Sequence, residues 1–200
     1  MSSGLQGPAP DERPEPGGRR NELGIRVDPD AEPEIPTRRA VLSALVKHEP
    51  GVLAKVSGLF SRRQFNIESL TVGPTSNEER ARITLVIEEP EPGVEQAMKQ
   101  LEKLVPVIDV TELSGAIERE LALIKVDGES PDAVGAVAEM HDGTVVDVDH
   151  DSITVEVTGS EQQIDAALET FERFGIREIK RTGTAALARG DRPTAGADDQ

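Results

Sequence analysis

The chain has 200 residues, of which 38 are acidic and 22 basic, giving a net charge of -16 at pH 7. An acidic surface repels phosphate backbones and anionic lipids, and the absence of Trp and Tyr removes the usual platforms for stacking bases. With no cysteine, the chain has no disulfide, thiolate nucleophile or cysteine metal site. Composition therefore argues against nucleic-acid and membrane partners.

Two further features of composition bear on the setting of the protein. No apolar run approaches the roughly 20 residues needed to span a bilayer, and the N-terminus lacks the apolar core of a signal peptide, so we expect a cytoplasmic protein. Only six of the basic residues are lysine, and such an acidic, lysine-poor composition is typical of salt-loving organisms.

The two ends of the chain differ in composition from its middle. Seven of the fourteen prolines fall within residues 1–36, where apolar side chains are few. Such a segment buries too little surface to offset the entropy of ordering, so we predict a disordered acidic tail over 1–36. We predict a second disordered tail over 189–200. The folded part then lies between residues 38 and about 188.

The first half of that part alternates between the spacing of strands and that of helices. Apolar residues occupy every second position from Ala81 to Ile87, as in a half-buried strand. Val52, Val56 and Phe60 recur as on one helix face. We predict strands at 40–46, 67–72, 81–87 and 107–113 and helices covering 52–60 and 94–104.

The same order of elements recurs in the second half. Ser130 and Pro131 are typical of a helix start, as N-cap and first helical residue. We predict strands at 121–126, 144–148, 153–157 and 176–180 and helices covering 130–141 and 164–174.

The repeated β-α-β-β-α-β order predicts an α+β protein of two tandem ferredoxin-like modules, over 38–114 and 117–184. Each module is an antiparallel sheet with both helices on one face. The other face is bare, and two modules can bury these faces side by side or across a dimer interface, so we expect a homo-oligomer.

The usual carriers of catalysis are missing from the sequence. His48, His141 and His150 each lack a second histidine or carboxylate at the spacing of a metal-binding helix. The alternating acidic residues from Asp147 to Asp151 lack the central glycine and terminal glutamate of a calcium loop, which favours a solvated hairpin. No Gly-rich phosphate loop follows a strand. We therefore predict no catalytic residues and no metal site in this chain.

The first strand-to-helix turn, Lys47 to Leu53, is the best candidate for a binding site. Gly51 has no side chain to block approach, and the backbone N–H groups of Gly51, Val52 and Leu53 would point outward at the positive end of the helix dipole. Such a turn can bind a carboxylate, although Pro-Gly at a helix start is also common punctuation. We predict that His48 and Asn66 bracket the head group of a small amino acid, and that Val52 and Ile67 face its aliphatic side chain.

Several strings of this region resemble one known family. They are Glu49-Pro50-Gly51-Val52-Leu53, Gly58-Leu59-Phe60-Ser61-Arg62-Arg63 and, most specific of all, Asn66–Thr75, NIESLTVGPT. The segments 103–110 and 118–125 add to the likeness, which extends over roughly residues 38–188. The chain resembles the small regulatory subunit of acetolactate synthase (acetohydroxyacid synthase), whose N-terminal module is an ACT domain.

This resemblance implies a function and a set of partners. Family members bind valine or a related branched-chain amino acid between the ACT domains of a homodimer. They activate a large catalytic subunit and make it feedback-sensitive, and the thiamine diphosphate, Mg²⁺ and FAD belong to that subunit. The resemblance assigns effector binding to six residues: His48, Gly51, Val52, Leu53, Asn66 and Ile67.

The chain departs from the family pattern at His48, where bacterial members commonly have Asn or Asp. An amide or carboxylate oxygen accepts a hydrogen bond from the ligand's ammonium group, and only a neutral imidazole can do the same. The identity of the sensed amino acid therefore depends on this residue.

A different class of function shares the same order of elements, namely stand-alone amino-acid sensors of the ACT/RAM type that control transcription. That function needs a DNA-binding pair of helices. Residues 1–36 are too rich in Pro and Gly to supply one, which makes this the weaker alternative.

Overall fold

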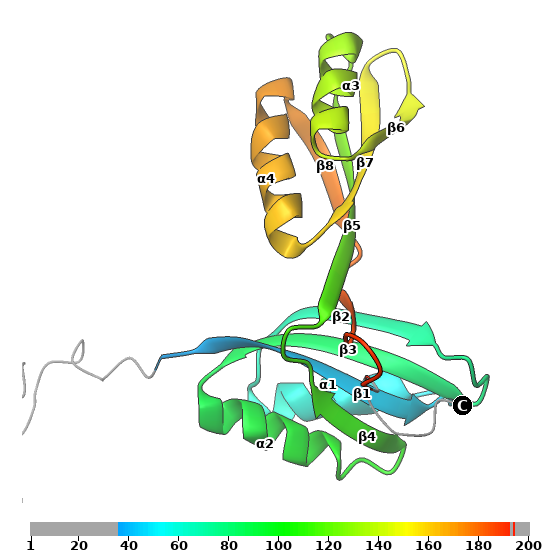
Figure 1. Cartoon of the computed structure of the whole chain (residues 1–200), viewed down its shortest axis with the longest axis vertical. Coiled ribbons are helices and arrows are strands. Elements are labelled where there is room, and N and C mark those ends of the chain that lie inside the picture. Colours follow the sequence, from blue (N-terminus) through cyan, green and yellow to red (C-terminus); the bar gives the residue numbers. More distant parts are fainter. Residues whose placement is uncertain (1–35, 193, 195–200) are drawn as a thin grey trace, which may run out of the picture. The chain divides into compact units, whose positions relative to one another are not determined.

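The computed structural model describes residues 36–192 and 194, which form two successive β-α-β-β-α-β sets and one further strand (Figure 1). The first set consists of β1 Arg38–Lys47, α1 Val52–Arg63, β2 Ile67–Pro74, β3 Arg80–Glu89, α2 Glu91–Leu101 and β4 Val107–Glu112. The second consists of β5 Ile117–Asp127, α3 Pro131–Met140, β6 Thr144–Val148, β7 Ser152–Gly159, α4 Glu161–Phe171 and β8 Ile176–Arg181. The further strand is β9, Ala185–Leu187.

Both sheets are antiparallel, with strand orders β2-β3-β1-β4 and β6-β7-β5-β8. The two helices of each set cover one face of their own sheet (Figure 1). The predicted α+β fold of two tandem modules is therefore confirmed. The predicted N-terminal tail lies outside the described residues except for residue 36, and so do 193 and 195–200 of the predicted C-terminal tail.

The core of the first module follows from the alternation of its strands. Leu42, Ala44 and Val46 project from β1 toward the helices and are at most 1% exposed. From α1, Val56 and Phe60 pack onto them, at the i and i+4 spacing that places both side chains on one helix face. The ring of Phe60 also meets that of Phe65 edge-to-face, with centroids 5.6 Å apart.

The second module repeats this arrangement with other side chains. Ala122, Ile124 and Val126 of β5 are fully buried against α3 and α4, and Phe171 fills the core from the end of α4. His141, at the C-terminal end of α3, lies with its ring centroid 6.3 Å from that of Phe171.

The helix ends agree with the sequence prediction only in part. Ser130 occupies the N-cap of α3 as expected, yet its side chain makes no capping hydrogen bond, whereas Ser160 and Gln163 form a complete capping box on α4. The helix α2 ends at Leu101, so Leu104 packs against the core from beyond the helix. Apolar spacing alone therefore extended α2 past its end.

The helix-free face of the first sheet is partly covered by the chain itself. Val41, Val86 and Leu113 form a second buried cluster there with Ala186 of β9. β9 pairs with the start of β5, from Ile117↔Leu187 to Arg119↔Ala185. The sequence prediction left this face for another module or another copy, and it missed β9, a strand of three residues too short to show a period.

None of the helices within residues 36–192 is long and apolar enough to cross a membrane.

The two cores make a stability prediction. Phe60→Ala and Phe171→Ala each leave a cavity in a different core, and each should lower the free energy of unfolding by about 3–5 kcal/mol. Because the chain has no Trp or Tyr, unfolding in urea is best followed by far-UV circular dichroism. The control is Met140→Ala: its side chain is 78% exposed, and the change should stay within about 0.5 kcal/mol. A core variant as stable as this control would contradict the assignment of that core.

Candidate functional site

The turn between β1 and α1 has an open glycine at the helix start. Gly51 is the N-cap residue, with φ +82°, and a Cβ at this position would meet no atom within 4 Å. This left-handed conformation favours glycine, and the surrounding space leaves the backbone open to a ligand. Glu49 N–H donates to the Lys47 carbonyl at 3.0 Å, which closes the turn.

The start of α1 presents backbone donors and no negative side chain. The helix has no side-chain cap and no acidic residue in its first turn. The first N–H groups of a helix have no partner within it, and the helix dipole adds positive potential at this end. Of the three backbone N–H groups predicted to point outward, that of Val52 donates to the Glu49 carbonyl over a long 3.4 Å. The arrangement suits a carboxylate.

His48 is exposed and held against the turn between β2 and β3. Its backbone N–H donates to the Glu79 carbonyl at 2.7 Å, and its Nδ1 lies 3.3 Å from the Glu78 carbonyl oxygen. A carbonyl oxygen only accepts, so Nδ1 carries the hydrogen in this contact. In a neutral ring, this contact leaves Nε2 as an acceptor for a ligand. A hollow of about 620 Å³ opens beside this ring and extends to Arg80 and Ile108.

The apolar residues predicted for the site differ in exposure. Val52 is 5% exposed and its side chain belongs to the core of the module, so it can meet a ligand only through its backbone. Leu53 is 44% exposed and gives the turn an apolar surface. Ile67 is partly buried against the same core.

One chain does not bring the two halves of the predicted site together. Asn66 and Ile67 follow α1, whereas the turn at Gly51 precedes it, and the 12 residues of α1 separate them by about 18 Å. The sheet register agrees: Lys47 pairs with Arg80 at the start of β3, and Ile67 pairs with Ile87 near its end. The predicted residues thus form two groups at opposite ends of one helix.

Other polar groups contribute to the structure in ways that the sequence prediction missed. Glu120, in β5, is 5% exposed although its side chain is charged. Thr184, between β8 and β9, is 4% exposed. The alternation of β5 could have revealed the first, because Glu120 falls on the inward side with Ala122 and Ile124. A largely apolar hollow also lies apart from the turn, beside Thr71, Ile117 and Leu187.

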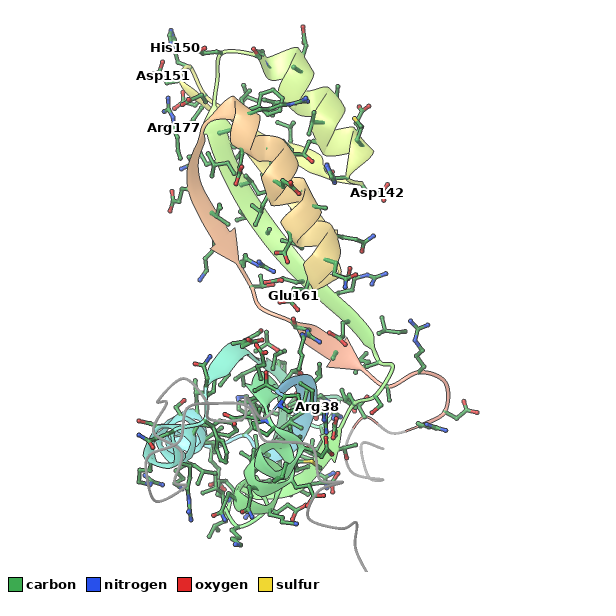
Figure 2. All side chains as sticks on the ribbon, turned by 90° about the vertical axis from the view of Figure 1, so that its left-hand side faces the viewer. Arg38, Asp142, His150, Asp151, Glu161 and Arg177 are labelled. Atoms are coloured by element: carbon green, nitrogen blue, oxygen red, sulfur yellow. The ribbon has the colours of Figure 1, made fainter. Side chains whose placement is uncertain are left out.

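The acidic hairpin between β6 and β7 is solvated, as expected. His150 and Asp151 lie at its tip, with side chains 94% and 81% exposed and a contact of 2.9 Å between Nδ1 and Oδ1 (Figure 2). Within residues 36–192, no three His, Cys, Asp or Glu side chains are grouped closely enough to hold a metal ion.

A group of carboxylates lies around Glu68, the second residue after Asn66. Glu68 is exposed, and the limited desolvation that it has is the first cause of its raised pKa. Its hydrogen bond with Glu88 and the charges of Glu88 and Glu161 raise the pKa further, while Arg39 lowers it. Arg39 bridges Glu118 and Glu161 at 2.8 and 2.9 Å.

Comparisons with known proteins give the class of this chain. Residues 42–109 match the family described as the AHAS small subunit-like ACT domain, and residues 119–190 match the small subunit of acetolactate synthase. The first module is thus similar to the ACT domain of acetolactate synthase small subunits, and the second is similar to another part of such subunits.

Individual relatives are similar over most of their length. The acetolactate synthase small subunit of Mycobacterium bovis is 46% identical, covering 76% of this chain and 92% of that protein. The probable acetolactate synthase small subunit of Archaeoglobus fulgidus is 44% identical, and the match covers 76% of this chain and 97% of that protein. The crystal structure of the small subunit from Thermotoga maritima superposes with a TM-score of 0.72 at 34% identity, covering 78% of this chain and 99% of that one. The chain belongs to the acetolactate synthase small-subunit family.

The cluster of carboxylates around Glu68 leads to a prediction: Glu68→Gln should stabilise the chain in a pH-dependent way. A raised pKa means that the folded state prefers the protonated carboxyl, so the wild-type chain loses stability as pH rises from the ordinary pKa of a glutamate toward the raised one. Glu68→Gln avoids that loss and should melt at a higher temperature at pH 7. The difference in melting temperature between the wild-type chain and Glu68→Gln should disappear below about pH 4, where the glutamic acid is protonated and both side chains are neutral.

Exposed Glu102→Gln is the control, and melting followed by circular dichroism at both pH values is the measurement. If the gain of Glu68→Gln were the same at both pH values, ionisation of Glu68 would not be its cause.

Proposed function

We propose that this chain is the regulatory small subunit of acetolactate synthase, binding valine or a related branched-chain amino acid and activating and feedback-regulating a large catalytic subunit. The observation that carries the proposal is the uncapped, unobstructed start of α1 at Gly51 in a chain of this family. The complex would act in valine, isoleucine and leucine biosynthesis, in the cytoplasm. Its thiamine diphosphate, Mg²⁺ and FAD would be held by the large subunit.

The effector site in this proposal lies between two copies of the ACT module. β2 is an edge strand of the first sheet, and the outer N–H and C=O groups of such a strand can pair with a second β2. Antiparallel pairing about a two-fold axis sets the Ile67 end of one strand against the Pro74 end of the other. Pro74 pairs with Ala81, next to the Arg80–Lys47 pair that precedes the turn. Asn66 of one copy then approaches the Gly51 turn of the second, which joins the two groups that one chain holds apart.

The chemistry of these groups fits an amino acid with an apolar side chain. The backbone donors at Gly51 and Leu53 would bind the carboxylate, with the helix dipole adding to the attraction. The Asn66 amide oxygen and His48 Nε2 can each accept a hydrogen bond from the ammonium group. Leu53 and Ile67 supply the apolar surface that a branched side chain needs.

The first test is to mix the purified chain with its large subunit and to assay acetolactate production with and without valine. Activity should rise on mixing and should fall when valine is added. Unchanged activity on mixing would overturn the proposal.

The site itself is tested by two isosteric variants of Gly51. Asn and Asp both tolerate the left-handed backbone better than other residues do, and they differ in charge alone. Gly51→Asp places a carboxylate where the ligand's carboxylate would bind, so the Kd for valine, measured by calorimetry, should rise about tenfold or more while activation on mixing persists.

Gly51→Asn is the matched control and should weaken valine binding less than Gly51→Asp. Equal binding by the two variants would place the effector's carboxylate elsewhere.

A further inference from the structure

Two hydroxyl side chains of β2 hold the backbone of one residue that follows the second module. Thr184 N–H donates to Ser69 Oγ at 2.8 Å, and Thr71 Oγ1 donates to the Thr184 carbonyl oxygen at 2.9 Å. Ser69 and Thr71 lie two positions apart on the strand, so both project from the helix-free face of the first sheet. The backbone of Thr184 is therefore bound on both sides by a single strand. We refer to these two hydrogen bonds as the Thr184 clamp.

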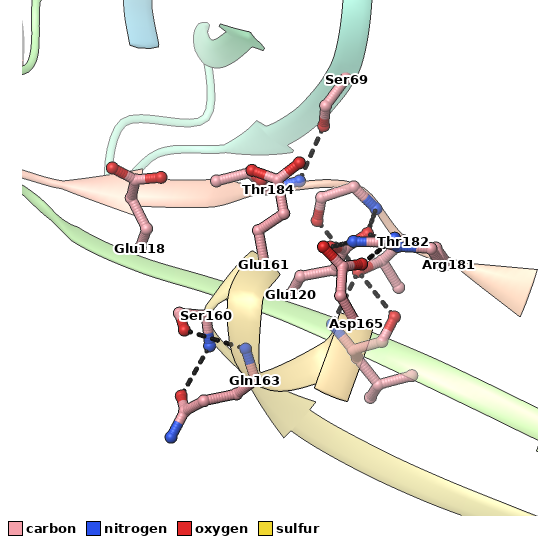
Figure 3. A network of polar contacts seen from close by, with 12 residues as sticks. Ser69, Glu118, Glu120, Ser160, Glu161, Gln163, Asp165, Arg181, Thr182 and Thr184 are labelled. Carbon is pink, nitrogen blue, oxygen red and sulfur yellow. Dashed lines mark hydrogen bonds and ion pairs between the residues drawn. The ribbon is translucent and has the colours of Figure 1, made fainter. Parts of the chain in front are cut away.

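The neighbours of Thr184 are tied to the second module. Gly183 N–H donates to Glu120 Oε1 at 3.1 Å, and Arg181 binds both oxygens of that carboxylate, at 3.0 and 2.6 Å. Arg181 also reaches Asp165 of α4 at 2.8 Å (Figure 3). The hydrogen bond with Glu120 is the main cause of the raised pKa of Arg181, so this guanidinium stays charged. Residues 181–184 thus link β2 of the first sheet to β5 and α4 of the second module.

The linking segment has little freedom to move at the clamp. Gly183 has φ +83°, and a Cβ there would lie 2.6 Å from Ser69 Oγ, so only glycine permits the close approach. Glu120 and Thr184 are both buried, and a buried polar group that loses its partner is costly, so the bonds of this network are strongly favoured to stay made. A displacement of β2 then either carries Thr184 along or breaks both bonds of the clamp.

β2 is also the strand that the proposed effector site uses. It begins directly after Asn66, and Ser69 lies two residues beyond Ile67. We propose that Ser69 and Thr71 are positioning residues that transmit effector binding from the ACT module to the C-terminal module through the Thr184 clamp. This inference rests on the proposed function, because it concerns the response to an effector bound at that site.

The test removes both hydroxyls of the clamp without changing the shape of β2 greatly. The Ser69→Ala/Thr71→Val double variant, in the full chain mixed with the large subunit, should bind valine with a Kd close to that of the unaltered chain. It should also activate the large subunit without valine as the unaltered chain does. The factor by which bound valine lowers acetolactate production should shrink by about fivefold or more. Allosteric coupling between two sites typically has at least that size.

The matched control uses the same residue types at the same spacing on another strand. Ser152→Ala/Thr154→Val alters β7 of the second sheet and should leave valine inhibition unchanged. Thr71→Ser, which keeps a hydroxyl, should retain the response. If the double variant fails to fold, Ser69→Ala alone, which keeps the Thr71 bond, serves as the test.

The outcomes separate the two proposals. An unaltered chain that neither activates nor binds valine overturns the proposed function, and the coupling falls with it. An unaltered chain that responds normally, together with a double variant inhibited to the same degree, overturns the coupling alone. A double variant that loses activation and valine binding together would show that the clamp only maintains the fold, which also overturns the coupling.

Discussion

A four-stranded antiparallel sheet with both helices on one face leaves its other face without cover, and much of this structure follows from that constraint. In the first module the exposed strands would present Val41 and Val86 to water. Their burial requires a segment from elsewhere, and the chain supplies Ala186 from β9, after the second module is complete. The same return of the chain brings Thr184 against β2. The path of the chain after the second module therefore has two consequences: it covers the first sheet with β9, and it bonds Thr184 to β2.

The helix-free face of the second sheet meets the constraint in another way. Lys125, Thr154 and Glu178 project from it beside Leu123, so this face is mostly polar and charged, and Lys125 pairs with Glu178 at 3.5 Å. Such a face tolerates water, whereas Val41 and Val86 do not. The two modules share an order of elements and differ in which faces need burial, which is why β9 lies over the first sheet.

The repeating elements were predictable because each has a period that its burial imposes. β3 has an apolar residue at every second position from Ala81 to Ile87, and α1 repeats its apolar side chains every turn. β9 shows no such pattern, since three residues of Ala-Ala-Leu cannot reveal a period. Of the three, Ala186 is buried, and its burial depends on the distant Val41. Long-range contacts of this kind are decided by the path of the chain, which local spacing does not encode.

The candidate site was predictable in part for the same reason. Pro50 and Gly51 form a local turn whose backbone geometry the sequence specifies, and the structure has that turn. The distance between Gly51 and Asn66 is also local information, because a helix of known length separates them. A helix holds its ends apart, so residues at its two ends can meet around one small ligand only if a second copy supplies one of them. An effector bound in this way would press on β2 of both copies at once, and β2 is the strand to which Thr184 is bonded. The segment that covers the first sheet would thereby also respond to a ligand bound at the edge strand β2.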